Sequence, residues 1–130
     1  MSMSIAVVLT ALLFGGMTLY SFGFAAFLFS ALPPHTAGPT LRAAFPWFYR
    51  FVALTSAIAA ILWWPHSNGA AVVMASITFT TILVWQILMP AINRATDAGL
   101  KTRFKWLHAL SVVVTLGHIG ASGWLIAHVT

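Results

Sequence analysis

The chain has 130 residues, of which 61% are hydrophobic and only 5% are charged. Soluble domains carry about 25% charged residues, so this composition excludes a soluble enzyme, and disorder would need low hydropathy with high charge. The formal net charge of +5 arises from very few charges, which form no dense basic stripe and therefore argue against nucleic-acid binding. The absence of cysteine excludes disulfides and thiolate metal sites. We therefore expect a single transmembrane domain over residues 1–130.

Uncharged runs predict where the chain crosses the membrane. Residues 1–41, 51–93 and 106–130 contain no acidic or basic residue, and one helical span needs about 20 apolar residues. Pro33 and Pro34 should end the first helix, and the turn residues 65–69 divide the middle run in two. Pro90 should end the third helix. The predicted fold is all-α, a four-helix transmembrane bundle with helices at about 5–32, 45–64, 70–89 and 104–128.

The basic residues predict the orientation. All six lie after the first predicted helix or between the last two: Arg42, Arg50, Arg94, Lys101, Arg103 and Lys105. In a chain with four spans these two regions share one side, which the positive-inside rule places in the cytosol. Both termini are then outside, and we expect a multi-pass protein of the bacterial inner (cytoplasmic) membrane. Tryptophans near the predicted helix ends fit the aromatic belts of such proteins.

Small residues recur at helical spacing in the first and last predicted helices. They include Gly16 and Gly23 in the first, and Gly117, Gly120 and Gly123 in the last. Small residues let membrane helices approach closely, although glycine is also common there without any such role. The pattern favours close helix packing, within the chain or against a partner.

Histidine is the main residue type left for chemistry, because a single acid excludes paired-carboxylate catalysis and carboxylate-rich calcium or magnesium sites. His35 and His108 lie at nearly the same predicted depth on the cytosolic side, and Asn93 and Arg94 reach that level too. These four residues are predicted to form a cytosol-facing ligand pocket. It could bind a metal through the two histidines, hold an anionic headgroup with Arg94, or shuttle a proton. The alternative is a pair of interfacial histidines bonded to water and helix ends.

Other polar residues lie deeper or on the opposite side. His118 is near the middle of the last predicted helix and Tyr20 is at a similar depth in the first, so both are predicted to be buried polar groups. A hydrogen bond to a hydroxyl group would satisfy His118 without further function. His66 and His128 are expected at the outer surface. A haem would need two axial histidines at one depth, which His35 and His108 alone provide, so haem is a less favoured cofactor than a metal ion.

The sequence also resembles a known family. Residues 33–38, Pro-Pro-His-Thr-Ala-Gly, with Phe45-Pro46 downstream, are similar to the loop after the first helix in the transmembrane protein 205-like family. Further matches are Gly16-Met17, Leu88, Pro90, Phe104, His108, Leu110, Ser111, Leu116 and Gly117. The resemblance implies a four-helix membrane protein whose bacterial members are domains of unknown function, and it singles out His35 and His108. His66, His118 and His128 lie outside the pattern.

Three functions remain open from the sequence. The first is metal or small-ligand binding at the pocket of His35, Asn93, Arg94 and His108. The second is an accessory or assembly subunit of a larger membrane complex, such as a respiratory one, with other subunits or a second copy as partners. The third is a membrane oxidoreductase, which is least favoured because the chain has one acid and no cysteine. A non-enzymatic role is therefore preferred.

Overall fold

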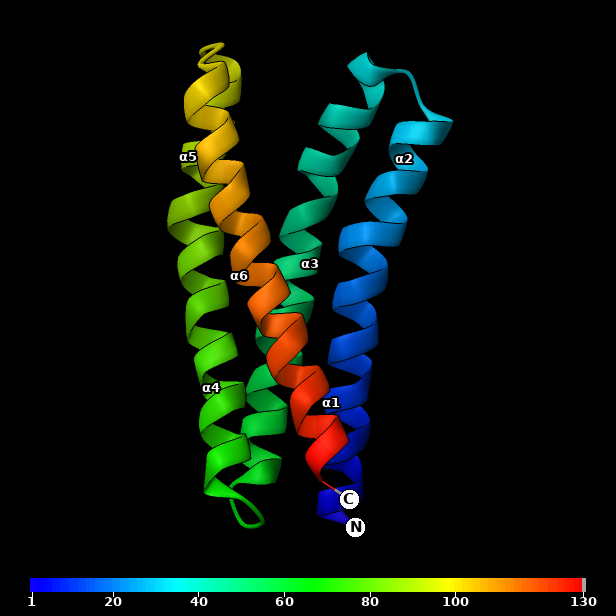
Figure 1. Ribbon diagram of the computed structural model, residues 1–130, viewed down its shortest axis with the longest axis vertical. Coiled ribbons are helices and arrows are strands. Elements are labelled where there is room, and N and C mark those ends of the chain that lie inside the picture. The colour runs from blue at the N-terminus through cyan, green and yellow to red at the C-terminus, as the bar shows by residue number, and fades with distance from the viewer. Residues whose placement is uncertain (130) are drawn as a thin grey trace.

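The computed structural model describes residues 1–129, which form four long helices and, within that range, no strand (Figure 1). The first helix comprises α1 (Ser2–Thr18), a π-helical segment η1 (Leu19–Phe24) and α2 (Ala25–Ala31); the second is α3 (Pro34–Trp63). The third comprises α4 (Asn68–Leu83), a second π-helical segment η2 (Val84–Leu88) and α5 (Met89–Asp97); the fourth is α6 (Lys101–His128). All four are long and apolar enough to cross a membrane. The predicted four-helix, multi-pass architecture is confirmed.

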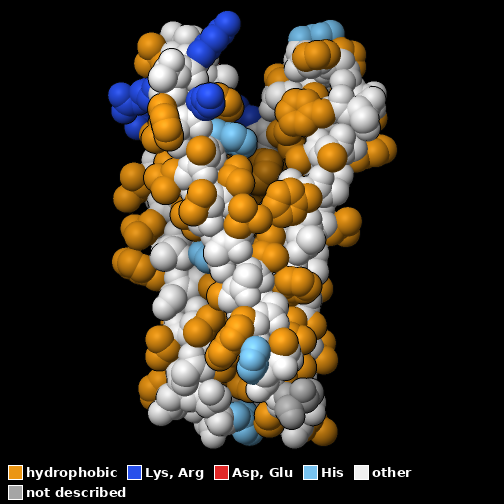
Figure 2. All heavy atoms as spheres, in the orientation of Figure 1, with side chains coloured by type: hydrophobic (Ala, Val, Ile, Leu, Met, Phe, Trp, Pro, Cys, Tyr) orange, Lys and Arg blue, Asp and Glu red, His pale blue; other side chains and the backbone are white. Residues whose placement is uncertain are grey.

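The helices run antiparallel along a common long axis. Both termini and the α3–α4 turn lie at one end, here called the terminal end (Figure 1). The α2–α3 and α5–α6 connections lie at the other, here called the basic end because it carries most of the Lys and Arg residues (Figure 2). Helix α1 packs against α3 and α6, and α3 packs against α4. At the basic end, α2 packs mainly on α3 and α5 on α6, so the bundle divides into two helical hairpins.

Close packing of α1 positions the rest of the bundle. The ring of Phe51 lies so near Gly16 that an added Cβ would be 2.7 Å from it, and the ring of Phe14 lies 3.0 Å from the corresponding position of Gly123. These two glycines therefore give the close helix approach that the sequence favoured. Gly117 and Gly120 on α6 face open space, with nothing within 4 Å. The small-residue pattern is thus used inside the bundle at α1 and at only part of α6.

The start of α3 corrects the predicted loop before the second helix. The sequence interpretation left residues 33–44 as a loop, but α3 begins at Pro34 and continues through Pro39 and Pro46. Pro33 is extended, with ψ of 150°, and its carbonyl accepts hydrogen bonds from the N–H groups of Thr36 and Ala37. Proline suits the first helical turn, where its missing N–H group has no intrahelical partner. The paired prolines therefore both end one helix and begin the next.

The third helix also extends beyond its predicted end. It does not stop at Pro90 but continues through α5 to Asp97. The π-helical segment η2 ends at Leu88, two residues before Pro90, and such local widening lets a membrane helix absorb a proline that cannot donate a hydrogen bond. Proline alone was therefore an incorrect signal for the helix end.

A glycine turn joins the third and fourth helices. Gly99 adopts a left-handed φ of 69°. Its N–H donates to the carbonyl of Thr96, and the N–H of Leu100 donates to that of Ala95, the two bonds of a Schellman motif. Because this turn is so short, α6 begins at Lys101 rather than at the predicted residue 104, and it ends at His128 as predicted.

Candidate functional site

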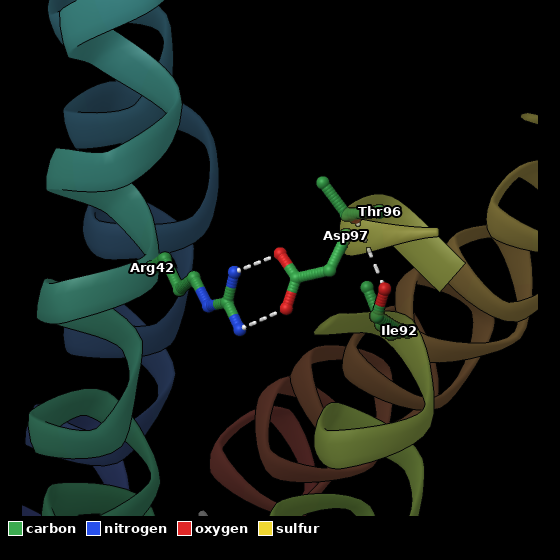
Figure 3. Close-up of polar contacts among 4 residues, drawn as sticks. All are labelled: Arg42, Ile92, Thr96 and Asp97. Carbon is green, nitrogen blue, oxygen red and sulfur yellow. Dashed lines mark hydrogen bonds and ion pairs between the residues drawn. The ribbon is translucent and has the colours of Figure 1, made fainter. Parts of the chain in front are cut away.

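The basic end is hollowed between the two hairpins (Figure 2). An ion pair crosses the gap: the guanidinium of Arg42 on α3 donates two hydrogen bonds, of 2.7 and 3.0 Å, to the carboxylate of Asp97 at the end of α5 (Figure 3). Both side chains are exposed. Asp97 is the one acidic residue in the sequence. The five other basic residues therefore have no acidic side chain left to neutralise them.

His35 lies at the tip of the first hairpin. It occupies the second position of α3, within the segment that the sequence interpretation assigned to a loop, and its side chain is exposed. The N-terminus of a helix carries a partial positive charge, about half an elementary charge for a long helix. This position therefore places His35 in a region of positive potential, which favours an anion over a metal cation.

Asn93, Arg94 and His108 belong to the second hairpin. Asn93 is half-buried and Arg94 exposed in the middle of α5. His108 on α6 is exposed, and its ring stacks on that of Phe104 with centroids 5.5 Å apart. The four predicted ligand residues thus come from both sides of the hollow, His35 from one hairpin and the other three from its neighbour. Among residues 1–129, no hydrogen bond links any two of the four.

A metal centre gains no support from the side-chain arrangement. No group of three or more His, Cys, Asp or Glu residues capable of holding a metal ion occurs in the described part of the chain. His35 and His108 would be two ligands at most. The basic end carries most of the Lys and Arg residues, which repel a cation.

The two predicted buried polar residues have partners inside the bundle. The Tyr20 hydroxyl on η1 donates a 2.7 Å hydrogen bond to the carbonyl of Ala44, and its ring stacks on Phe48 at 5.2 Å. His118 Nε2 lies 2.7 Å from the hydroxyl oxygen of Thr80 on α4. Each is partly buried. Both side chains therefore join helices across the bundle.

The remaining histidines lie near the termini. His66 in the α3–α4 turn is 2.7 Å from the hydroxyl of Ser2, and His128 stacks on Trp124 with centroids 4.4 Å apart. Both are exposed at the terminal end, away from the hollow. They provide matched controls for experiments on His35 and His108.

Arg50 is a residue that the sequence interpretation placed with the loop cations. In the structure it lies in the middle of α3, with its guanidinium carbon 4.6 Å from the ring centroid of Trp47 and 5.6 Å from that of Trp85 on η2. Guanidinium groups within about 6 Å of a tryptophan ring make favourable cation–π contacts. The spacing of Trp47 and Arg50, three residues apart on a helix, was the available signal. The contact with Trp85 could not be predicted from the sequence, because Trp85 lies on another helix.

A groove lined in part by Trp47 lies between the first helix and α3. It has a volume of about 610 Å³, within the range of about 300–1,000 Å³ that holds small molecules. Its lining is aromatic and aliphatic: Gly16, Leu19, Tyr20, Gly23, Phe24, Phe27, Trp47, Phe48 and Phe51. The exposed fractions of Leu19 and Phe27, 71% and 62%, show that the groove opens sideways on the helix surface.

Comparison with known proteins places most of the chain in one family. Residues 8–101 match the family described as "Domain of unknown function (DUF4149)". The match includes most of the first helix, the whole second and third helices and the α5–α6 turn, and therefore Arg42, Arg50 and Asp97. No curated protein and no solved structure matches the chain.

Proposed function

The chain belongs to the DUF4149 family, and we propose that it is a bacterial inner-membrane protein that binds a small anionic ligand between its hairpins. The basic end faces the cytosol in this proposal, and both termini face outward, because unbalanced Lys and Arg residues remain on the cytosolic side. The Pro-Pro-His-Thr-Ala-Gly segment at residues 33–38 supports a further assignment to the transmembrane protein 205-like family.

The single observation behind the proposal is the charge imbalance at the hollow. The one acid, Asp97, is bound by Arg42, while Arg94 and the basic residues of α6 border the same end of the bundle. Unpaired cations concentrated beside low-dielectric walls attract anions. A ligand there would lie between α3 on one side and α5 and α6 on the other.

Each proposed contact residue suits an anion. Arg94 supplies a planar guanidinium that can bind two oxygens of a phosphate or carboxylate. Asn93 supplies an amide N–H, and His35 and His108 supply ring N–H donors. The same set would hold a metal ion poorly, because the positive surroundings raise the energy of a bound cation.

Native mass spectrometry after gentle extraction from the producing membrane tests this proposal. We expect a wild-type mass above that of the bare chain by one small ligand. In an Arg94→Gln/His108→Ala double variant, the occupancy should fall by about tenfold or more, since tenfold corresponds to one charge-assisted contact. A His66→Ala/His128→Ala double variant is the matched control and should keep the ligand.

Two outcomes would contradict ligand binding at the hollow. One is equal occupancy in the wild type and the Arg94→Gln/His108→Ala variant. The other is a bound mass that both double variants lose equally, which would indicate general destabilisation. A bound mass equal to that of a metal ion, and lost in His35→Ala, would instead indicate a metal site formed by His35 and His108.

An accessory or assembly subunit of a larger membrane complex is the second candidate. Helix α6 supports it: within its most apolar window, 11% of the residues are buried, the lowest share of the four helices. Gly117 and Gly120 leave open space on this helix, and the neighbouring Val113 is 64% exposed. Small exposed residues suit close contact with another membrane helix. In the same spectra, stoichiometric foreign subunits would favour this role, and a bare monomer would count against it.

A further inference from the structure

Arg50 lies on α3, one of the four helices long and apolar enough to cross a membrane. Trp64, which is 62% exposed, marks the interface at the terminal end, as exposed tryptophans of membrane helices do. Arg50 precedes it by 14 residues, about 20 Å along a helix. The hydrocarbon region is about 30 Å thick, and Trp47, which is 66% exposed, lies one turn nearer the basic end, so we place the backbone of Arg50 just inside the opposite boundary. A charged side chain at this depth is costly and usually has a function.

The surroundings of Arg50 stabilise its charge only in part. Trp47 and Trp85 provide the two cation–π contacts, and side chains of α3 lean toward its N-terminus, which is the basic end. No acidic side chain can pair with Arg50, because Asp97 is bound by Arg42 on the same helix. An arginine without a counter-charge in this environment calls for an anion from outside the chain.

Arg50 does not itself line the groove between the first helix and α3, but Trp47 connects the two features. Trp47 belongs to both features, since it contacts the guanidinium of Arg50 and lines the groove. The groove is apolar along the rest of its wall and opens toward the lipid. Gly23 lines the groove, and a Cβ added there would lie 3.0 Å from the side chain of Leu19 on the same helix. An acyl chain fits such a surface, and a phosphate fits the adjacent guanidinium.

We propose that Arg50 anchors the phosphate of a bound anionic phospholipid, one acyl chain of which lies in the groove between the first helix and α3. The lipid is distinct from the ligand of the hollow, because this site uses other residues and faces the bilayer. A phospholipid carries both an acyl chain for the groove and a phosphate for the guanidinium. The apolar groove alone would accept any acyl chain, and the arginine alone would accept any anion. Phosphatidylglycerol is the probe that tests both halves together.

The test compares lipid retention in native mass spectrometry. Purified wild-type protein is titrated with phosphatidylglycerol or phosphatidylcholine carrying the same acyl chains. We expect one retained phosphatidylglycerol, with a preference of about tenfold or more over phosphatidylcholine. Arg50→Gln should remove that preference. Arg103→Gln, which makes the same change of net charge on an exposed position of α6, is the matched control and should keep it.

Three further measurements make the proposal falsifiable. Gly23→Leu fills the groove and should reduce phosphatidylglycerol retention although Arg50 is intact. If Arg50→Gln fails to assemble, Arg50→Lys keeps the charge but lacks the planar two-oxygen contact, and it should give a weaker preference for the anionic lipid. An unchanged preference in Arg50→Gln or Gly23→Leu overturns the proposal, as does displacement of the lipid by free inorganic phosphate. The Arg94→Gln/His108→Ala variant should retain the lipid, so failure of either proposed site is separable from failure of the other.

Discussion

The hydrogen bond between Trp63 and Thr10 should contribute measurably to the stability of the bundle. The indole N–H of Trp63 on α3 donates a 3.0 Å hydrogen bond to the hydroxyl of Thr10 on α1, and each residue is 1% exposed. In soluble proteins an unsatisfied buried donor costs about 1–3 kcal/mol, whereas coupling energies between membrane helices average about 0.6 and reach about 1.7 kcal/mol. Because neither water nor lipid can replace the lost partner here, we expect about 1 kcal/mol, in the upper half of that range.

A double-mutant cycle isolates this term. Thr10→Val keeps the shape of the side chain and removes its hydroxyl, and Trp63→Phe removes the indole donor. The free energy of unfolding of the wild type, both single variants and the double variant is measured in mixed micelles of increasing denaturing-detergent fraction. We expect a coupling of about 1 kcal/mol, or about fivefold in the folded-to-unfolded ratio. Purely additive losses would refute the reasoning, since they would mean that the two groups do not interact.

Two more predictions concern packing and orientation. Gly16→Ala brings a Cβ to 2.7 Å from the Phe51 ring and should lower the free energy of unfolding by about 1–3 kcal/mol. Gly120→Ala meets nothing within 4 Å and should not lower the free energy of unfolding. Equal losses for the two variants in the same assay would contradict the packing argument. The chain has no cysteine, so Asn68→Cys and Lys101→Cys each create a unique thiol. We expect an impermeant maleimide to label Asn68→Cys from outside intact spheroplasts and Lys101→Cys only after permeabilisation; the reverse pattern would exclude the proposed orientation.

The number of helices follows from the sequence because it depends on charge. Placing a Lys, Arg or Asp inside hydrocarbon is costly, so long uncharged runs and one polar turn at residues 65–69 predict four spans, as observed. Arg50 directly precedes the second uncharged run but lies within the predicted helix 45–64, at the position where we propose a bound anion.

The helix ends could not be predicted equally well, because proline has two effects. It ends a helix when its ring clashes with the preceding turn, and it begins one when it occupies the first position. Pro34 does the second, and Pro90 does neither because η2 widens the preceding turn. Which effect operates depends on how neighbouring helices pack, and that information is absent from local sequence.

The candidate pocket was sensitive to these boundaries. The similar depth of His35 and His108 was inferred from a first helix ending near residue 32 and a last helix beginning near residue 104, but α3 begins at Pro34 and α6 at Lys101. His35 therefore lies in the first turn of its helix, whereas His108 lies seven residues, or about 10 Å, along its own. A ligand shared by both would have to extend along the hollow, which favours an elongated anion over a single metal ion.

The irregular turns of the bundle direct attention to one turn of α3. Tyr20 on η1 stacks on Phe48 at 5.2 Å, and Trp85 on η2 lies 5.6 Å from the guanidinium of Arg50, two residues further along α3. π-Helical turns cost hydrogen-bond geometry and are often found at functional sites. Here both place an aromatic side chain against the same turn of α3, which also carries Trp47 and lines the lateral groove. Lipid binding at this turn would explain the two π-helical segments, the unpaired arginine and the groove together. Arg50, rather than any histidine, is therefore the first residue to vary.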